Sequence, residues 1–367
     1  MTLSGCGSEP LTMNRIGLAF LALVLSLATA GAAEKATPPP PDINQSVAFP
    51  GDVAVQRDLV YATIDGFRPL TLDLYQPTSK AKSPPRPVLL YVHGGSWVSG
   101  DARHLKGFDD LPSTLAALAA KGYVVAAVNY RLAGEAHFPA PVQDVKSALR
   151  WLRGHATDFN LDTTRMMAWG VEAGGQIAAM VGTSCGVAAL EPAADANSKV
   201  QLASDCVQGV IDWAGPADFA SWDVDAGRNA EAAATTHLGA YLSCEPADCA
   251  PGVVRAASPL TYVGAQTPPF FIQQGSADKY VAPAQSHKLY DALRAQRVPA
   301  DIRIYADVGQ DFAKDGTTDP TTRTQALADM QDFIEKTFPP PPDSKTEATE
   351  KPAKKSSAKA KAAKAHK

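Results

Sequence analysis

Two patterns of apolar residues alternate along most of the chain. Residues 87–92 and 124–128 are continuous apolar runs, which are typical of strands buried on both faces of a parallel sheet. Residues 72–75 alternate between apolar and polar positions, as a half-buried strand does. Further short runs with strand character lie at residues 166–169, 210–213, 270–272 and 302–305.

Helical patterns separate these runs. Residues 111–121 are predicted to form a crossover helix, and Val142, Val145, Leu149 and Leu152 share one helical face. A last helix is expected at about 322–337. Strands that alternate with helices in this way predict a largely parallel sheet of eight strands with helices on both faces. Residues 221–261 are interpreted as a small helical lid over the carboxyl edge of the sheet.

The two ends of the chain differ from this central part. Asn14 and Arg15 precede an apolar run at 16–27 and then small residues, which is typical of a signal peptide, with Met13 as the expected true start. A protein exported to the periplasm or secreted, with no transmembrane anchor after cleavage, is therefore predicted. The expected divisions are a signal peptide at 1–33, a proline-rich linker at 34–48, a folded domain at 49–338 and a disordered tail rich in lysine and alanine at 339–367.

Charge narrows the range of partners. The formal net charge is −4, and the folded part has no basic helix or basic patch with aromatic residues, so nucleic acid is not an expected partner. The tail carries eight lysines and two glutamates between Ser344 and Lys367. It is read either as a solubility extension or as a tether to an anionic polymer of the cell envelope.

Cysteines support export. Cys6 falls within the expected signal peptide, and four cysteines remain in the mature chain. An even number in an exported chain predicts two disulfides, here Cys185 with Cys206 and Cys244 with Cys249. Free thiols are the alternative. No histidine spacing completes a metal-ligand set, and neither a metal nor a cofactor is expected.

A glycine-rich loop is the first feature that points to chemistry. His93-Gly94-Gly95-Ser96-Trp97 follows a buried strand directly, where backbone amides turn toward a developing oxyanion. Further motifs follow at residues 129–132, 138–145, 212–218 and 257–261. With these motifs the chain resembles the feruloyl-esterase-like and hormone-sensitive-lipase-like carboxylesterases of the α/β-hydrolase superfamily, from about Val55 to Phe338. The resemblance implies an α/β-hydrolase fold.

The resemblance also implies a catalytic triad that this chain does not keep. The family's nucleophile position, in a G-x-S-A-G-G turn, holds Glu172, and the position of the family's histidine holds Gln310. Asp278 matches the family's acid. The oxyanion hole is expected from the amides of Gly94, Gly95 and Ala173. These glycines and alanine, with the altered triad, are the predicted site residues.

Three functions are compatible with such a site. Glu172 lies at a helix N-terminus, and its carboxylate is expected in the oxyanion hole, unless the residue is merely tolerated. A pseudoenzyme that binds a small ester-like ligand or a protein partner is the first hypothesis, since loss of nucleophile or base costs about a millionfold in turnover in comparable triads. An active ester hydrolase with an unusual nucleophile or base is the second, with His237 in the lid region as one residue that could reach the pocket. An envelope-attached structural or interaction protein is the third. A literal G-x-S-x-G at 182–186 follows a helical stretch rather than a strand, so Ser184 is not expected to be a nucleophile.

Overall fold

The computed structural model describes residues 46–339, except 79–82, 106–107, 109, 193–202, 227–231, 246–247 and 315–316. The predicted signal peptide, most of the linker, and the tail from residue 340 onward lie outside the described residues. Within the described ranges no helix is long and apolar enough to cross a membrane.

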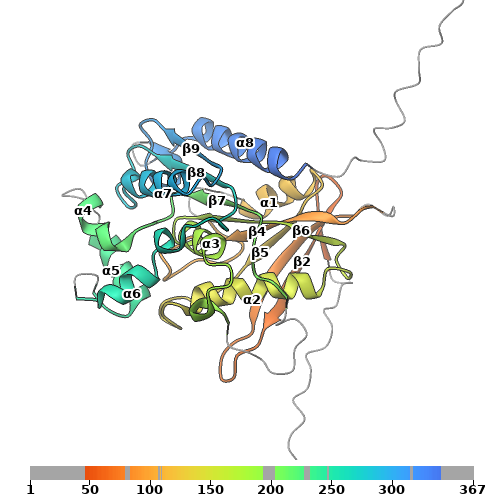
Figure 1. The fold of residues 1–367 in the computed structure, drawn as a ribbon. Coiled ribbons are helices and arrows are strands. Elements are labelled where there is room, and N and C mark those ends of the chain that lie inside the picture. Colours follow the sequence, from red (N-terminus) through yellow and green to blue (C-terminus); the bar gives the residue numbers. More distant parts are fainter. Residues whose placement is uncertain are drawn as a thin grey trace, which may run out of the picture. The chain divides into compact units, whose positions relative to one another are not determined.

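Nine strands form one mixed sheet, in the order β1-β2-β3-β5-β4-β6-β7-β8-β9 (Figure 1). Strands β1 to β3 pair antiparallel with their neighbours, whereas the pairs from β5 across to β9 are parallel. The strands span Ser46–Phe49 (β1), Val53–Ala62 (β2), Leu70–Pro77 (β3), Arg86–Val92 (β4), Val124–Val128 (β5), Leu161–Val171 (β6), Gly209–Trp213 (β7), Phe270–Gly275 (β8) and Ala300–Tyr305 (β9). A separate two-stranded ribbon joins Ala313–Lys314 (β10) to Thr317–Thr318 (β11).

The predicted fold class is confirmed, with one strand more than expected. The central strands β4, β5 and β7 are buried at every position, as the continuous apolar runs at 87–92 and 124–128 predicted for β4 and β5. The sequence patterns located neither β1 nor β2; β1 lies at the edge of the sheet and exposes its first three residues. Because β1 begins at Ser46, residues 46–48 belong to the sheet and not to the predicted linker.

Helices cover both faces of the sheet (Figure 1). Helices α1 (Leu111–Ala119) and α8 (Pro320–Thr337) pack in one apolar cluster with the side chains of one face. Helices α2 (Ala140–Gly154), α3 (Ala173–Thr183) and α7 (Pro283–Ala295) pack in a second cluster on the other face. Two covered faces explain why the parallel strands are apolar on both sides.

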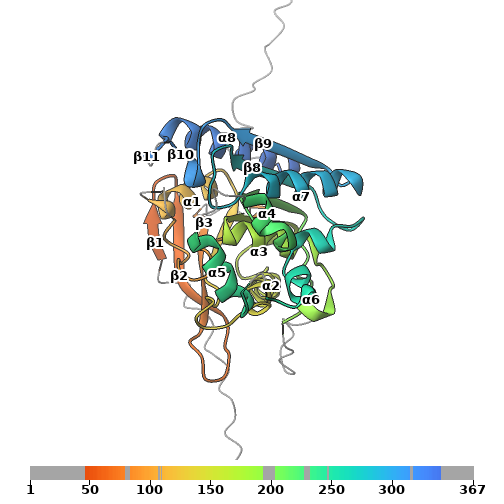
Figure 2. The same ribbon diagram turned by 90° about the vertical axis from the view of Figure 1, so that its left-hand side faces the viewer.

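Three short helices occupy the segment predicted to be a lid. They are α4 (Trp222–Ala226), α5 (Ala232–Leu242) and α6 (Pro251–Ala256), which lie together beside α3 and α7 (Figure 2). Tyr241 of α5 stacks on Trp97 of the glycine-rich loop at 4.7 Å between ring centroids, and its carbonyl accepts a hydrogen bond from the amide of Phe138 at 2.9 Å. This segment is therefore packed onto the loop that carries the candidate site.

Both predicted disulfide pairings are confirmed. Cys185 is bonded to Cys206, and Cys244 is bonded to Cys249. The first links the end of α3 to the segment before β7, and the second closes a short loop between α5 and α6.

Candidate active site

The sharp turn between β6 and α3 presents Glu172 at the carboxyl edge of the sheet. Glu172 has φ 54° and ψ −114°, a strained conformation for a residue with a side chain, of the kind found at a nucleophile elbow. The turn is also tight at its neighbour Gly174, where a Cβ atom would lie 2.1 Å from the carbonyl oxygen of Val92. The chain thus keeps the elbow geometry although the residue at its tip is not a serine.

The Glu172 carboxylate lies against the glycine-rich loop after β4. Its Oε2 accepts hydrogen bonds from the amides of Gly95 at 3.0 Å and Ser96 at 2.7 Å. The amide of Ala173 and the hydroxyl of Ser96 also lie near this carboxylate and lower its pKa. The side chain is buried, with 3% of its surface exposed. A carboxylate oxygen therefore occupies the place where amides of this loop would meet an oxyanion.

The amides that meet the carboxylate differ in one position from the expected set. We expected Gly94, Gly95 and Ala173, and Ser96 takes the place expected for Gly94. The cause is local backbone geometry, since Gly95 and Ser96 have positive φ values of 106° and 55° and turn their consecutive amides inward. Gly94 instead provides space, because a Cβ atom there would lie 3.3 Å from Oε2 of Glu172.

Burial and hydrogen bonding act in opposite directions on Glu172. Removal from water raises the pKa of its carboxyl group, whereas the amides of Ala173, Ser96 and Gly95 lower it. Burial has the larger effect, so the pKa lies above its ordinary value. The Glu172 carboxyl group is thus held by donors that suit its ionised form, at a desolvation cost.

Asp278 lies after β8 and lines the same small pocket as Glu172 and Gln310. Its Oδ1 accepts from the amides of Tyr280 at 2.8 Å and Val281 at 3.0 Å, and its Oδ2 accepts from Nε2 of Gln274 at 3.2 Å. Burial raises the pKa of Asp278 to about 7, despite the two amide hydrogen bonds that lower it. The carboxyl group predicted to be the acid of the triad is therefore held by amides of its own loop.

Gln310 opens a 3₁₀ turn, η6 (Gln310–Phe312), after β9. It lines the pocket opposite the elbow, but a carboxamide cannot take up a proton at any useful pH. The enclosed part of this pocket has room for about one water molecule. Three aromatic residues complete much of its wall, namely Phe108, Trp213 and Phe312.

A hydrogen-bonded chain that the sequence did not reveal leads from this site to α5. The Ser96 hydroxyl lies 2.8 Å from the Tyr280 hydroxyl, which lies 2.6 Å from Nδ1 of His237. His237 was noted only as a residue that could reach the pocket, and Tyr280 carried no signal beyond its position two residues after Asp278. Among the residues that the structure describes, no three histidine, cysteine or carboxylate side chains are grouped to hold a metal ion.

Stability should depend on pH through Asp278. Because the folded pKa is about 7 and the ordinary value is 3.8, the folded state binds more protons than the unfolded state between these two pH values. The free energy of unfolding will therefore fall as the pH rises from about 4 to 7, at up to about 1.4 kcal/mol per pH unit for one such group. Urea unfolding of the native protein and Asp278→Asn across this range should show a shallower slope in the variant.

Asp212 provides a comparison for this measurement. Burial also raises its pKa to about 7, and it lies on β7 outside the pocket lining. Asp212→Asn should reduce the pH dependence of the free energy of unfolding by a similar amount, and the double variant should lose both contributions. An equal pH dependence of the free energy of unfolding in the native protein and the Asp278→Asn variant would contradict the raised pKa of Asp278.

Comparison with known proteins supports the family relation. The sequence profile of the BD-FAE family matches residues 72–293, which is more than half of the chain. Esterase LipC of Mycobacterium tuberculosis is 30% identical over 211 residues, which cover 58% of this chain and 49% of LipC. Esterase LipQ of the same organism is 28% identical over 230 residues, covering 62% of this chain and 51% of LipQ. The chain thus spans about half the length of these relatives.

Solved structures show the same fold. A truncated carbohydrate esterase from gut microbiota has a TM-score of 0.64 at 24% identity, covering 80% of this chain and 99% of that structure. Esterase 2 of Thermogutta terrifontis, solved with propionate, has a TM-score of 0.62 at 23% identity, covering 80% of this chain and 97% of that structure.

Proposed function

Since this chain belongs to the BD-FAE family of α/β-hydrolase-fold esterases, we propose that it is a member that has lost esterase catalysis and retains the site for binding a ligand or partner. The observation that carries the proposal is the contact of Glu172 Oε2 with the amides of Gly95 and Ser96, at 3.0 and 2.7 Å. These donors would otherwise stabilise the anion that forms when an ester is attacked. With its own carboxylate there, the protein carries a permanent occupant of the oxyanion hole.

Gln310 and Glu172 together remove both chemical steps of the family's reaction. A serine nucleophile needs a base that accepts its proton, and the amide of Gln310 cannot act as one. A glutamyl ester formed on Glu172 would need the same base to activate water. Loss of the nucleophile or the base costs about a millionfold in turnover in comparable enzymes.

We also propose that the protein acts outside the cytoplasm. Two disulfides in a chain of this size support an oxidising compartment. The predicted signal peptide at 1–33 is consistent with export to the periplasm or secretion. A mature N-terminus at about residue 31–34 on the protein recovered from outside the cytoplasm would test this.

An active hydrolase is the second candidate, and one observation favours it. Ser96, Tyr280 and His237 form a hydrogen-bonded chain of side chains, and the amide of Ser96 donates to the Glu172 carboxylate. His237 could accept a proton through Tyr280, which would give the site a base in place of Gln310. The filled oxyanion hole argues against this reading, because any intermediate would have to displace Glu172 from its amides.

Hydrolysis of 4-nitrophenyl acetate by the purified protein separates the two candidates. We expect the native protein to release nitrophenol no faster than its Glu172→Ala variant, and fluorophosphonate treatment to leave its mass unchanged. Turnover above that control, lost in His237→Ala or Ser96→Ala, would favour the active hydrolase and overturn the first proposal.

A further inference from the structure

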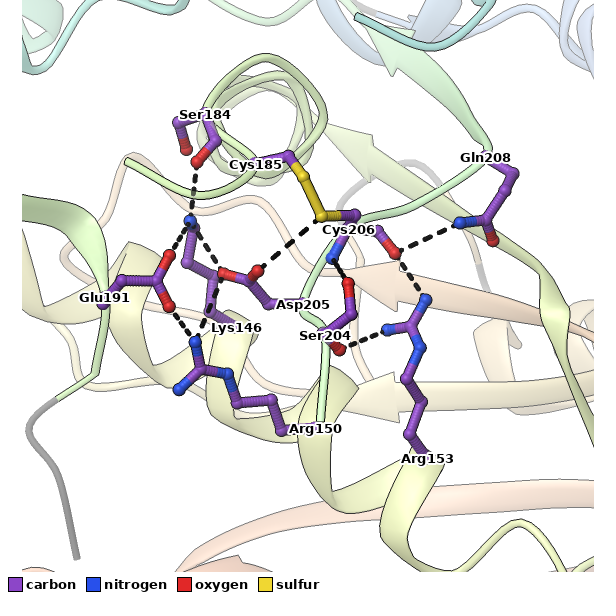
Figure 3. Close-up of a disulfide and its surroundings, with 10 residues drawn as sticks. All are labelled: Lys146, Arg150, Arg153, Ser184, Cys185, Glu191, Ser204, Asp205, Cys206 and Gln208. Atoms are coloured by element: carbon purple, nitrogen blue, oxygen red, sulfur yellow. Dashed lines mark hydrogen bonds and ion pairs between the residues drawn. A yellow bond between two sulfur atoms is a disulfide. The ribbon is translucent and has the colours of Figure 1, made fainter. Parts of the chain in front are cut away.

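The Cys185–Cys206 disulfide lies at the surface, directly beside a buried charge cluster (Figure 3). Cys185 follows Ser184, the C-cap residue of α3, and its side chain is exposed. Cys206 lies three residues before β7 begins at Gly209. An external dithiol can therefore reach this bond without unfolding the protein.

Lys146 of α2 forms the centre of the buried cluster. Its side chain is fully buried, and its Nζ lies 2.8 Å from Oδ2 of Asp205, 2.8 Å from the carbonyl oxygen of Ser184 and 3.2 Å from Oε1 of Glu191 (Figure 3). Ser184 and Glu191 accept hydrogen bonds from this ammonium group, and Asp205 forms an ion pair with it. Arg150, one turn further along α2, contacts both Glu191 and Asp205.

The disulfide closes the ring of groups around this ammonium. Ser184 and Asp205 are the chain neighbours of Cys185 and Cys206, so the bond holds both acceptors at Lys146. Burial lowers the pKa of Lys146, and Asp205 raises it. Loss of such a partner leaves the charge of a buried cation uncompensated, which strongly lowers the free energy of unfolding of the protein. The stability of the fold around Lys146 therefore depends on where Asp205 is held.

Both chain segments that leave the disulfide lead to the candidate active site. Helix α3 runs from Thr183 back to Ala173, which adjoins Glu172. Strand β7 runs from Gly209 to Trp213, whose side chain lines the pocket and whose carbonyl accepts a hydrogen bond from the Glu172 amide at 2.8 Å. A disturbance at the disulfide therefore reaches the elbow through two elements.

We propose that the Cys185–Cys206 disulfide is a redox-sensitive latch. While it is closed, it keeps α3 and the pocket stably folded through the charge cluster at Lys146. A dithiol opens it by thiol–disulfide exchange, supplying two electrons and two protons, so that two cysteine thiols form and the dithiol becomes a disulfide. Asp205 then leaves Lys146, and the buried ammonium loses the partner that the bond held in place. The latch acts whether or not the site hydrolyses esters.

Hydrogen exchange of the full chain tests the latch. In Cys185→Ser/Cys206→Ser we expect the amides of α3 to exchange at least about tenfold faster than in the native protein. The matched control is Cys244→Ser/Cys249→Ser, which removes the other disulfide and should leave α3 within about threefold of native. Unchanged α3 exchange in the first variant, or equal acceleration in both, would overturn the proposal.

The Lys146→Met variant tests whether the disulfide acts through the charge cluster or only by restricting the conformations of the chain. Methionine fills a similar space without a charge, and Arg150 remains beside Asp205 and Glu191. In this background, loss of Cys185–Cys206 should change α3 exchange by less than about threefold. The same acceleration as with Lys146 present would show that the disulfide acts only by restricting the chain, and would refute the role of the cluster.

A third measurement leaves Cys185, Cys206 and Lys146 unchanged, so that it does not depend on the folding of variants at these positions. In Cys244→Ser/Cys249→Ser, dithiothreitol can open only the latch, and alkylation with mass spectrometry reports its state. We expect α3 exchange to accelerate on reduction and to recover on reoxidation. No change on confirmed reduction would overturn the proposal, whereas the ester-hydrolysis result would stand unaffected.

Discussion

Replacing Glu172 by serine and Gln310 by histidine together will raise turnover of 4-nitrophenyl acetate at least about 100-fold above the native protein. The serine would stand at the tip of an elbow that already has the strained φ of 54°. Removal of the carboxylate frees the amides of Gly95 and Ser96 to receive an oxyanion. Asp278 remains in the pocket to orient a histidine at position 310.

The single variants are the controls for this result. Triad members act as a unit, so Glu172→Ser alone and Gln310→His alone should each stay close to the native rate. Adding Asp278→Ala to the double variant should remove most of the gain. A folded double variant without turnover would mean that the site has changed beyond these two positions, as would a gain that survives Asp278→Ala.

Asp144→Ala will lower the free energy of unfolding by about 3 kcal/mol, because it breaks a buried ion pair. The Asp144 carboxylate accepts from the amide, Nε and Nη2 of Arg131 at 2.9, 2.8 and 2.6 Å, and both side chains are largely buried. The pair also supports the glycine-rich loop. Tyr130, next to Arg131, donates its hydroxyl to the carbonyl of His93 at 3.0 Å and stacks on its ring.

Urea unfolding with a matched exposed pair checks this expectation. Asp101→Ala removes the partner of His104, and these side chains are 48% and 81% exposed. Exposed pairs contribute little, so this control should change the free energy of unfolding by less than about 1 kcal/mol. Similar losses in the two variants would show that burial of the Arg131–Asp144 pair adds nothing.

Local patterns in the sequence predicted the central sheet and the elbow. The run at 124–128 coincides with β5, and the match of residues 170–175 to the elbow motif located Glu172 at the turn. Such features are determined by residues that are close together in the chain, through the spacing of apolar residues and the composition of turns. The strands β1 and β2 were not located in this way; β1 has only four residues, three of which are exposed.

Contacts between distant segments could not be predicted in this way. The choice of Ser96 rather than Gly94 as a donor depends on backbone angles within the loop. The chain from Ser96 through Tyr280 to His237 joins three segments far apart in the sequence. No role was predicted for Lys146, because its partners come from segments that a disulfide brings together. Each of these features arises from tertiary packing.

The carboxylate at the elbow also affects how such proteins are counted in a cell. Surveys that label serine hydrolases with fluorophosphonates detect an attacking hydroxyl, and Glu172 offers a carboxylate already held by two amides. A genome census by family would include this chain, whereas, on the proposed function, a chemical census would not. The difference between the two inventories would therefore identify further members in which an acidic residue replaces the nucleophile.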